Sequence, residues 1–240
     1  MSSLSFDILP ATEADIPTLA SIAGAAFEND TNTMVKSKSL STVAEEHASN
    51  MNGALSSWLS RPVKCSLLKA VDKTTSATIG WVCWGNYGLG NEPTPTAEQI
   101  AEEKAKPIAT QEHIIAEAQN IQSGVQRLKE ITSKDMERWI DKIMPAGTKC
   151  RYIASIVVHP SFQGKGVAKA LIQWGAERAD AEGAICWVHS SDGGWKAFQA
   201  LGFEEIERLE LDLDQFAEIE RPGGGKWGTY TFRYGVRQPR

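Results

Sequence analysis

The sequence predicts an α/β fold of the α+β type: one mixed, mostly antiparallel sheet with helices on both faces and a helical insertion. Two strand candidates, residues 66–72 and 78–87, are joined by a short polar turn and indicate an antiparallel hairpin. A buried strand ending at Pro160, a glycine-containing turn and a helix lead to another strand at 185–190, and this order requires a parallel crossover. Residues 204–213 and 228–237 alternate in polarity and form a closing antiparallel pair.

The first ninety residues predict a strand, two helices and the hairpin. Residues 6–10 form a short strand, and Thr12 is suited to cap the first helix. Apolar residues then recur at helical spacing, at Ile16, Leu19, Ala20, Ala23 and Phe27. We expect a polar loop over 28–39, a second helix over 42–59, and the hairpin turn at 73–76.

Residues 89–147 differ from their surroundings and predict a charged helical insertion between two strands. Thr96 and Gln99 have the spacing of a capping box. One apolar stripe runs from Ile114 to Leu128, and a second, from Met136 to Ile143, predicts a following helix. We expect the insertion to pack on one side of the sheet or to cover a site as a lid. There is no internal repeat, so residues 1–240 are expected to form one domain.

Beyond the crossover strand, the chain alternates again between helix and strand. A helix over 167–182 stops at Gly183, and a strand follows at 185–190. A short helix over 194–201 stops at Gly202, immediately before the closing pair of strands.

Composition excludes several classes of protein. The 240 residues are 42% hydrophobic and 23% charged, which is typical of a globular protein, and a net charge of −5 argues against a nucleic-acid partner. No signal peptide or membrane-length apolar run is present, so we expect no membrane partner and a cytoplasmic location. Four scattered cysteines are expected to be buried and reduced, and four dispersed histidines predict no metal site.

The most informative motif is the turn from Gln163 to Ala168, which lies between the buried strand and a helix N-terminus. Backbone N–H groups and the helix dipole at such a turn suit a phosphate or pyrophosphate. A Walker A loop is excluded because the order Gly-Lys-Ser/Thr is absent. A dinucleotide-binding loop is also excluded, because Lys169 stands where a third small residue is required.

Gln163, Gly166 and Ala168 fill the motif Gln/Arg-x-x-Gly-x-Gly/Ala, so the loop resembles the acyl-CoA loop of the GNAT superfamily of N-acetyltransferases. The approach through Val158-His159-Pro160 and the helix ending Leu201-Gly202-Phe203 resemble that family as well. The resemblance is strong over 150–205 and looser over 5–88. Residues 89–147 have no counterpart in the family's common core. A GNAT-type fold and acetyl-CoA as co-substrate are what this resemblance implies.

The resemblance also implies how acetyl-CoA is held. Backbone groups of Ile156, Val157 and Val158 are expected to pair with the pantetheine arm, and the Val158 N–H to stabilise the oxyanion. Pyrophosphate is expected to bind the turn and the first helical residues, namely Gln163, Gly164, Lys165, Gly166, Val167, Ala168 and Lys169. Lys165 and Lys169 would add positive charge near the adenosine end.

One catalytic group of the family is missing. Many members carry a tyrosine four residues before the glycine of Gly-Phe, as the acid for the departing thiolate, but this chain has Phe198 there. Ser191, Ser190 or a tyrosine from elsewhere could replace it, the thiolate could take its proton from water, or the protein could bind acyl-CoA without turnover. His189, near the end of its strand, is a candidate general base.

Acceptor contacts are expected from four residues: Glu28 and Asp30 after the first helix, Trp84 on the hairpin, and Ser155 on the crossover strand. Together these features predict acetyl transfer to a primary amine of a small molecule by direct attack in a ternary complex. The alternatives are acetylation of protein or peptide amines, and a catalytically silent acyl-CoA-binding or sensor domain. We expect a monomer or a homodimer.

Overall fold

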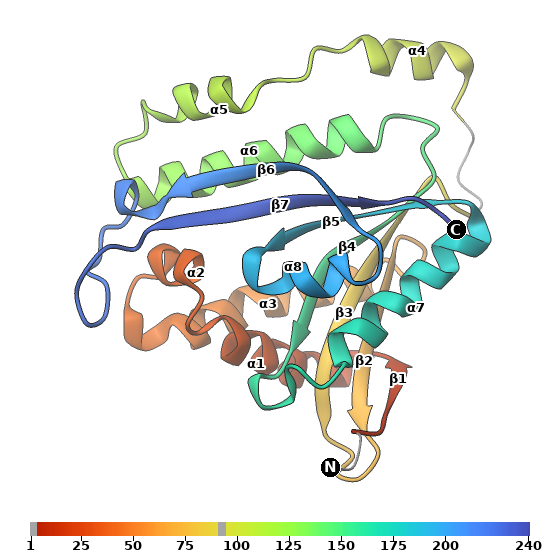
Figure 1. Cartoon of the computed structure of the whole chain (residues 1–240), viewed down its shortest axis with the longest axis horizontal. Coiled ribbons are helices and arrows are strands. Elements are labelled where there is room, and N and C mark those ends of the chain that lie inside the picture. The colour runs from red at the N-terminus through yellow and green to blue at the C-terminus, as the bar shows by residue number, and fades with distance from the viewer. Residues whose placement is uncertain (1–3, 91–94) are drawn as a thin grey trace.

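The computed structural model describes residues 4–90 and 95–240, which build one seven-stranded sheet in the order β1-β2-β3-β4-β5-β7-β6 (Figure 1). The strands are β1 (Phe6–Pro10), β2 (Cys65–Asp72), β3 (Thr78–Tyr87), β4 (Cys150–Val158), β5 (Ile185–Ser191), β6 (Glu204–Asp212) and β7 (Thr229–Arg237). All neighbours pair antiparallel except β4 and β5, which are parallel. The predicted mixed sheet with one parallel crossover is therefore confirmed.

Helices cover both faces of the sheet. They are α1 (Ile16–Phe27), α2 (Thr31–Lys36), α3 (Val43–Leu59), α4 (Ala97–Ala105), α5 (Gln111–Ala118), α6 (Gly124–Ile143), α7 (Val167–Glu182) and α8 (Asp192–Gln199). Two indole groups of β3 show the two faces, because side chains alternate along a strand. Trp81 donates to the carbonyl of Leu19 in α1 at 2.9 Å, whereas Trp84 donates to the carbonyl of Leu171 in α7 at 3.2 Å.

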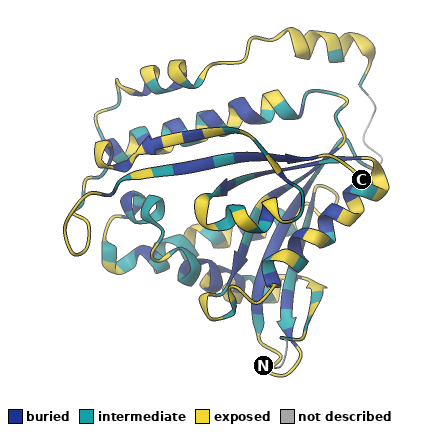
Figure 2. Ribbon diagram, viewed as in Figure 1, coloured by how far each residue is buried: buried dark blue, intermediate teal, exposed yellow. Residues whose placement is uncertain are grey.

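The helices between β3 and β4 cover the β5–β7–β6 part of the sheet, on the face opposite α7 and α8. Ile114 of α5 and Leu128 of α6 share a buried cluster with residues of these strands, and Trp139 stacks on Tyr234 of β7 at 4.6 Å. Figure 2 shows α6 buried along the side that meets the strands, whereas α4 is exposed. The expectation that this segment packs on one side of the sheet is confirmed.

A buried polar network fixes α6 to the sheet. Asp135 is fully buried, where it accepts from the Tyr234 hydroxyl at 2.5 Å and from Arg138 Nε at 2.7 Å. Arg138 also pairs with Glu207 of β6. Because a buried carboxylate is tolerated only with such partners, this network specifies how α6 sits on β6 and β7.

Two helix predictions were wrong. The segment 28–39, expected to be a loop, contains α2, which Asp30 caps by accepting from the Thr33 N–H at 2.9 Å. The stripe from Ile114 to Leu128 is not one helix, because α5 ends at Ala118 and α6 begins at Gly124. A side chain at Gly124 would meet the Phe216 carbonyl oxygen at 2.4 Å, so this close approach requires glycine.

The helices and the cysteines can be compared with the predictions made from composition. Across residues 4–90 and 95–240, no helix is long and apolar enough to cross a membrane. All four cysteines are buried and free, as expected, and burial raises the pKa of the Cys186 thiol to about 12. Burial also raises the pKa of the Cys83 and Cys150 thiols, so these three thiols are protonated and unreactive near neutral pH.

β4 and β5 separate part-way along their length, and this separation positions the functional site. Their pairing ends at Ile153 and Val188, so Ala154 to Val158 have no partner on the β5 side. A register shift against β3 occurs at the same place, because Cys83 pairs with Ser155 but Trp84 pairs with Ile153. The unpaired Ala154 is a β-bulge, and bulges bend the strand that carries them.

Candidate active site

A cavity of about 600 Å³ lies where β4 and β5 diverge. Its walls come from the end of α1, the free edge of β4, the glycine turn with the start of α7, and the junction of β5 with α8. The lining residues are Ala26, Phe27, Asp30, Ile156, Val157, Val158, Phe162, Gln163, Gly164, Gly166, Val167, Ala168, Lys169, Ile172, Ser191, Gly193, Gly194, Lys196, Ala197 and Phe198. Nine of the ten residues predicted to bind acetyl-CoA therefore meet at one cavity, the exception being Lys165.

The glycine turn presents its backbone to this cavity. Gly164 and Gly166 have φ of 72° and 85°, a conformation that favours glycine, and a Cβ atom built on either meets no atom within 4 Å. The space above both residues is open, as a backbone cradle for a ligand requires. Because the turn leads into the 16-residue helix α7, the first N–H groups of the helix have no intrahelical acceptor. This is an arrangement suited to a pyrophosphate.

The free edge of β4 offers a backbone N–H donor at Val158. The N–H of His159 donates to the Ile79 carbonyl of β3 at 3.0 Å. Since backbone groups alternate in direction along a strand, those of Ile156 and Val158 point away from β3, toward the cavity. Gln163 Nε2 donates to the Val158 carbonyl at 3.1 Å, which fixes the turn against the strand and leaves the Val158 N–H facing the cavity.

Cationic side chains flank the glycine turn. Lys169 and Lys196 line the cavity, and Lys196 of α8 was not predicted. Lys165 turns away, because its ammonium donates to the Ser161 carbonyl at 2.9 Å and lies over the Phe162 ring. The expected charge contribution of the Lys165 side chain is therefore corrected: Lys169 and Lys196 are the lysines placed at the cavity.

Asp30, Tyr230 and Ser191 form a polar cluster at the end of the cavity nearest α1. The Tyr230 hydroxyl donates to Asp30 Oδ1 at 2.9 Å, while Asp30 Oδ2 accepts from the Thr33 hydroxyl at 2.7 Å. Burial and the charge of Asp30 raise the pKa of Tyr230, and the neighbouring Ser191 side chain opposes that shift. A tyrosine that stays protonated therefore connects two residues of the cavity wall.

Sequence reasoning did not identify Tyr230. Asp30 and Tyr230 are 200 positions apart, and no local pattern relates them. The polar character of the Asp30 segment was visible in the sequence, but the partner that β7 contributes depends on the order of strands in the sheet.

Phe198 lies in the cavity wall, as the missing-tyrosine argument requires. Its ring is buried and packs edge-on against Phe203 at 5.4 Å between centroids. Ser190, one of the alternative donors, is buried and donates to the Ser191 carbonyl at 2.9 Å. Of the replacements considered, Ser191 lines the cavity, and a distant tyrosine, Tyr230, donates to the cavity residue Asp30.

His189 does not suit the role of general base that the sequence suggested. Its ring is stacked between Phe232 and Tyr234, outside the lining of the cavity, and its Nε2 is buried with no hydrogen-bond partner. Burial and the nearby Lys36 ammonium lower the pKa of His189 to about 3. An imidazole with so low a pKa is a poor proton acceptor near pH 7, so this assignment is withdrawn.

The four residues predicted to contact the acceptor do not lie together. Asp30 lines the cavity, whereas Glu28 is exposed at the end of α1 and Ser155 lies on β4 opposite Cys83, both outside the cavity lining. Trp84 is wrong as an acceptor contact, because its side chain is fully buried against α7. Its ring lies so close to Gly175 that a Cβ there would be 2.1 Å from it.

Replacing Trp84 is expected to change stability rather than substrate affinity. Trp84→Ala removes a fully buried indole, and we expect the free energy of unfolding to fall by about 3–5 kcal/mol. Trp84→Phe keeps most of the volume and should fold with an unchanged KM for every amine. Urea unfolding and steady-state kinetics measure the two quantities, and an altered KM in a well-folded Trp84→Phe protein would contradict the core assignment.

Known proteins were compared with the chain by sequence and by structure. Residues 99–203 match the model of the Acetyltransferase (GNAT) family. The match spans the glycine turn and two of the helices that line the cavity, α7 and α8, and it begins inside the segment 89–147. No curated protein sequence matches the chain.

Solved structures share the fold at low sequence identity. A histone acetyltransferase HPA2 and related acetyltransferase of Corynebacterium glutamicum aligns with a TM-score of 0.56 and 15% identity, covering 99% of this chain and 98% of the other. The polyamine N-acetyltransferase of Drosophila melanogaster gives 0.55 and 14%, covering 98% and 100%. A PaiA N-acetyltransferase of Thermoplasma acidophilum in complex with coenzyme A gives 0.50 and 11%, covering 98% and 99%.

Proposed function

We propose that this chain, whose residues 99–203 match the model of the Acetyltransferase (GNAT) family, transfers the acetyl group of acetyl-CoA to a primary amine of a small molecule. The family supports an N-acetyltransferase, and the Drosophila neighbour is a polyamine N-acetyltransferase. The proposal adds the nature of the acceptor, direct attack in a ternary complex, and the residues that carry the reaction.

One observation carries the proposal: the unpaired edge of β4 and the glycine turn face the same cavity. An elongated ligand with a pyrophosphate at one end and an amide-containing arm can use both, since the turn offers N–H donors and the strand edge offers N–H and C=O groups. The space above Gly164 and Gly166 is open because neither residue has a side chain, so a ligand can approach the backbone there.

Each residue has a defined task in this proposal. When bound, acetyl-CoA supplies an activated acetyl thioester. The Val158 N–H is placed to donate to the developing oxyanion, and Lys169 and Lys196 offset phosphate charge. The Asp30 carboxylate receives the proton that the attacking amine loses, and Ser191 gives a proton to the thiolate as the carbon–sulfur bond breaks.

Tyr230 connects the two proton-transfer sites. Its hydroxyl bonds to Asp30 at 2.9 Å and also interacts with Ser191. After Ser191 has protonated the thiolate, the Tyr230 hydroxyl turns from Asp30 to return a proton to Ser191, and the protonated Asp30 then reprotonates Tyr230. The proton lost by the amine therefore balances the one gained by the thiolate. Tyr230 is a positioning and relay residue in this scheme, because it acts through Asp30 and Ser191.

Thiol release measured with a panel of primary amines tests the proposal. We expect release that depends on both acetyl-CoA and the amine, with intersecting initial-velocity patterns for a ternary complex. Parallel patterns, indicating an acetylated enzyme, would contradict direct attack. If peptide amines are acetylated and small amines are not, the acceptor is a protein or peptide and not a small molecule.

The competing hypothesis is a silent acyl-CoA-binding domain, which the phenyl side chain of Phe198 favours. Calorimetry separates it from the enzyme. Tight binding of acetyl-CoA with no thiol release on any amine would favour the silent domain, whereas binding followed by amine-dependent release would exclude it.

A further inference from the structure

A second cavity lies beside the first, between α2, α6 and the β5–β7 part of the sheet. We call this cavity of about 520 Å³ the lysine groove. Its chemistry is set by two lysines and a carboxylate, with an amide and two rings in the walls: Lys36, Lys129, Glu137, Asn32, His189 and Phe232. The roles proposed above for the acetyl-CoA cavity use none of these side chains.

Among the described residues, Lys36 brings a positive charge into the groove without forming a direct ion pair. Its side chain is half-buried, and within the described residues its ammonium has one hydrogen-bond partner, the Thr132 hydroxyl at 3.3 Å, and no ion pair. Burial lowers the pKa of Lys36 to about 8, Asp30 opposes this shift and Lys129 adds to it. The group is therefore mostly charged at pH 7, and a sequestered charge without a partner is costly unless a ligand provides one.

Unsatisfied polar atoms occur in the same wall. Asn32 Oδ1 and His189 Nε2 are both buried and have no hydrogen-bond partner. The Asn32 oxygen can only accept a hydrogen bond, whereas His189 Nε2, when it carries the proton, can donate to an anion, so of the two atoms it is His189 Nε2 that supports an anion site.

Three elements lead from the acetyl-CoA cavity to the lysine groove. The pairs of residues are Asp30, which caps α2, and Lys36 at its end; Ser191 and His189 on β5; and, on β7, Tyr230, which donates to Asp30, and Phe232. Residues two apart on a strand point to the same face and are about 7 Å apart, and six residues of helix rise about 9 Å. An acceptor with its nitrogen beside Asp30 therefore reaches Lys36 with a chain of several bonds.

We propose that the lysine groove binds an anionic group of the acceptor, so that the substrate is an amine carrying a carboxylate or phosphate several bonds from its nitrogen. This inference rests on the proposed acetyl transfer and specifies its substrate class. Lys36 provides the main charge, with Lys129 beside it, while Glu137 is exposed on the rim. Amines that lack an anion would leave the Lys36 ammonium without a partner.

Acetylation of matched amines tests this inference. We compare 5-aminopentanoate, 4-aminobutylphosphonate and pentylamine, which have similar length and differ in the terminal group. For one of the two anionic amines we expect kcat/KM about tenfold above that of pentylamine, as one charge-assisted contact gives. The preferred anion identifies the group as carboxylate or phosphate. Equal values for all three amines would overturn the inference.

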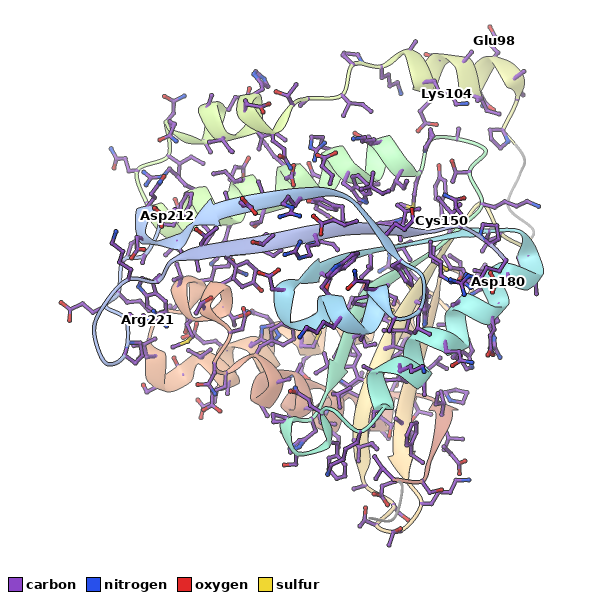
Figure 3. All side chains as sticks on the ribbon, in the orientation of Figure 1. Glu98, Lys104, Cys150, Asp180, Asp212 and Arg221 are labelled. Carbon is purple, nitrogen blue, oxygen red and sulfur yellow. The ribbon has the colours of Figure 1, made fainter. Side chains whose placement is uncertain are left out.

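Lysine variants assign the effect to the groove. Lys36→Met should remove the preference through a higher KM for the anionic amine, with the kinetics of pentylamine unchanged, and Lys36→Arg should retain it. Lys104→Met is the matched control, because Lys104 is exposed on α4, far from β5 (Figure 3). A preference that survives in a folded Lys36→Met protein would also overturn the inference.

Failure of the proposed function remains distinguishable from failure of this inference. If no amine gives thiol release, the proposed function fails, and calorimetric titration with the two anionic amines then tests the groove alone. Binding to the wild type that Lys36→Met abolishes would support an anion site. An absence of binding to the wild type would reject it.

Discussion

Gly166→Trp is expected to abolish acetyl-CoA binding while the protein remains folded. A Cβ at Gly166 meets no atom within 4 Å, so the side chain starts in open space, and we expect the indole to occupy the space proposed for pyrophosphate. The positive φ of 85° strains any side chain, which costs about 1–2 kcal/mol of stability. We expect the Kd for acetyl-CoA in titration calorimetry to rise by about 100-fold or more, or ~2.7 kcal/mol.

Gly223→Trp provides the matched control. Gly223 also has a positive φ, 78°, and open space around it, but it lies in the loop between β6 and β7. It carries the same backbone strain without obstructing the cavity, so its Kd should equal that of the wild type. If Gly166→Trp is folded and binds acetyl-CoA with wild-type affinity, the glycine turn is not the pyrophosphate site and the proposed function loses its main support.

Asp30→Asn and Tyr230→Phe are each expected to reduce kcat by about 100-fold, the usual scale for losing a proton-transfer group. Asparagine remains a good N-cap, so α2 should keep its start when the carboxylate is lost. The KM for acetyl-CoA should change little in either variant, because neither residue belongs to the glycine turn. Steady-state kinetics with saturating amine measures both quantities.

The double variant decides whether the two residues act in one relay. If Tyr230 works only through Asp30 and Ser191, the loss in Asp30→Asn/Tyr230→Phe should equal the larger single loss, since a broken relay cannot be broken twice. Losses that multiply to about 10,000-fold would show independent roles. Tyr152→Phe is the control: Tyr152 stacks on Trp187 at 5.2 Å on another part of the sheet, and its variant should keep the wild-type kcat.

A further substitution tests the missing phenol directly. Phe198 lines the cavity, and Phe198→Tyr restores a hydroxyl at the position where the family often has one. Added to Tyr230→Phe, it should recover part of the lost kcat if the defect is in proton delivery. No recovery, together with a lowered melting temperature of Tyr230→Phe, would instead indicate that Tyr230 serves mainly to hold β7 against α2.

Local patterns in the sequence predicted the parts of the site that local geometry builds. The turn at Gly164 and Gly166 is such a part, because glycine spacing, the preceding strand and the following helix are neighbours in the chain. The crossover between β4 and β5 was predictable for the same reason. Nine of the ten residues predicted to bind acetyl-CoA consequently line the cavity.

Long-range pairing decided what the sequence missed. Tyr230 reaches Asp30 only because β7 inserts between β5 and β6, and nothing near either residue encodes that order. Trp84 was assigned to the wrong environment because alternation separates two faces of a strand without saying which face meets a cavity. His189 follows the same logic: its position near a strand end was correct, but burial between two rings removes its basicity.

The strand order also has a consequence for synthesis of the protein. β7 is made after β6 yet pairs with both β5 and β6, so β6 has no neighbour in the sheet until β7 arrives. The nascent chain can complete β1 to β5 and the glycine turn while the β5 edge stays open, a state prone to association through that edge. Arrival of β7 closes the edge and delivers Tyr230 to Asp30 in a single event. Chains truncated before β7 would therefore expose the unpaired edge of β5, which is prone to aggregation, and would also lack Tyr230 of the relay proposed for acetyl transfer.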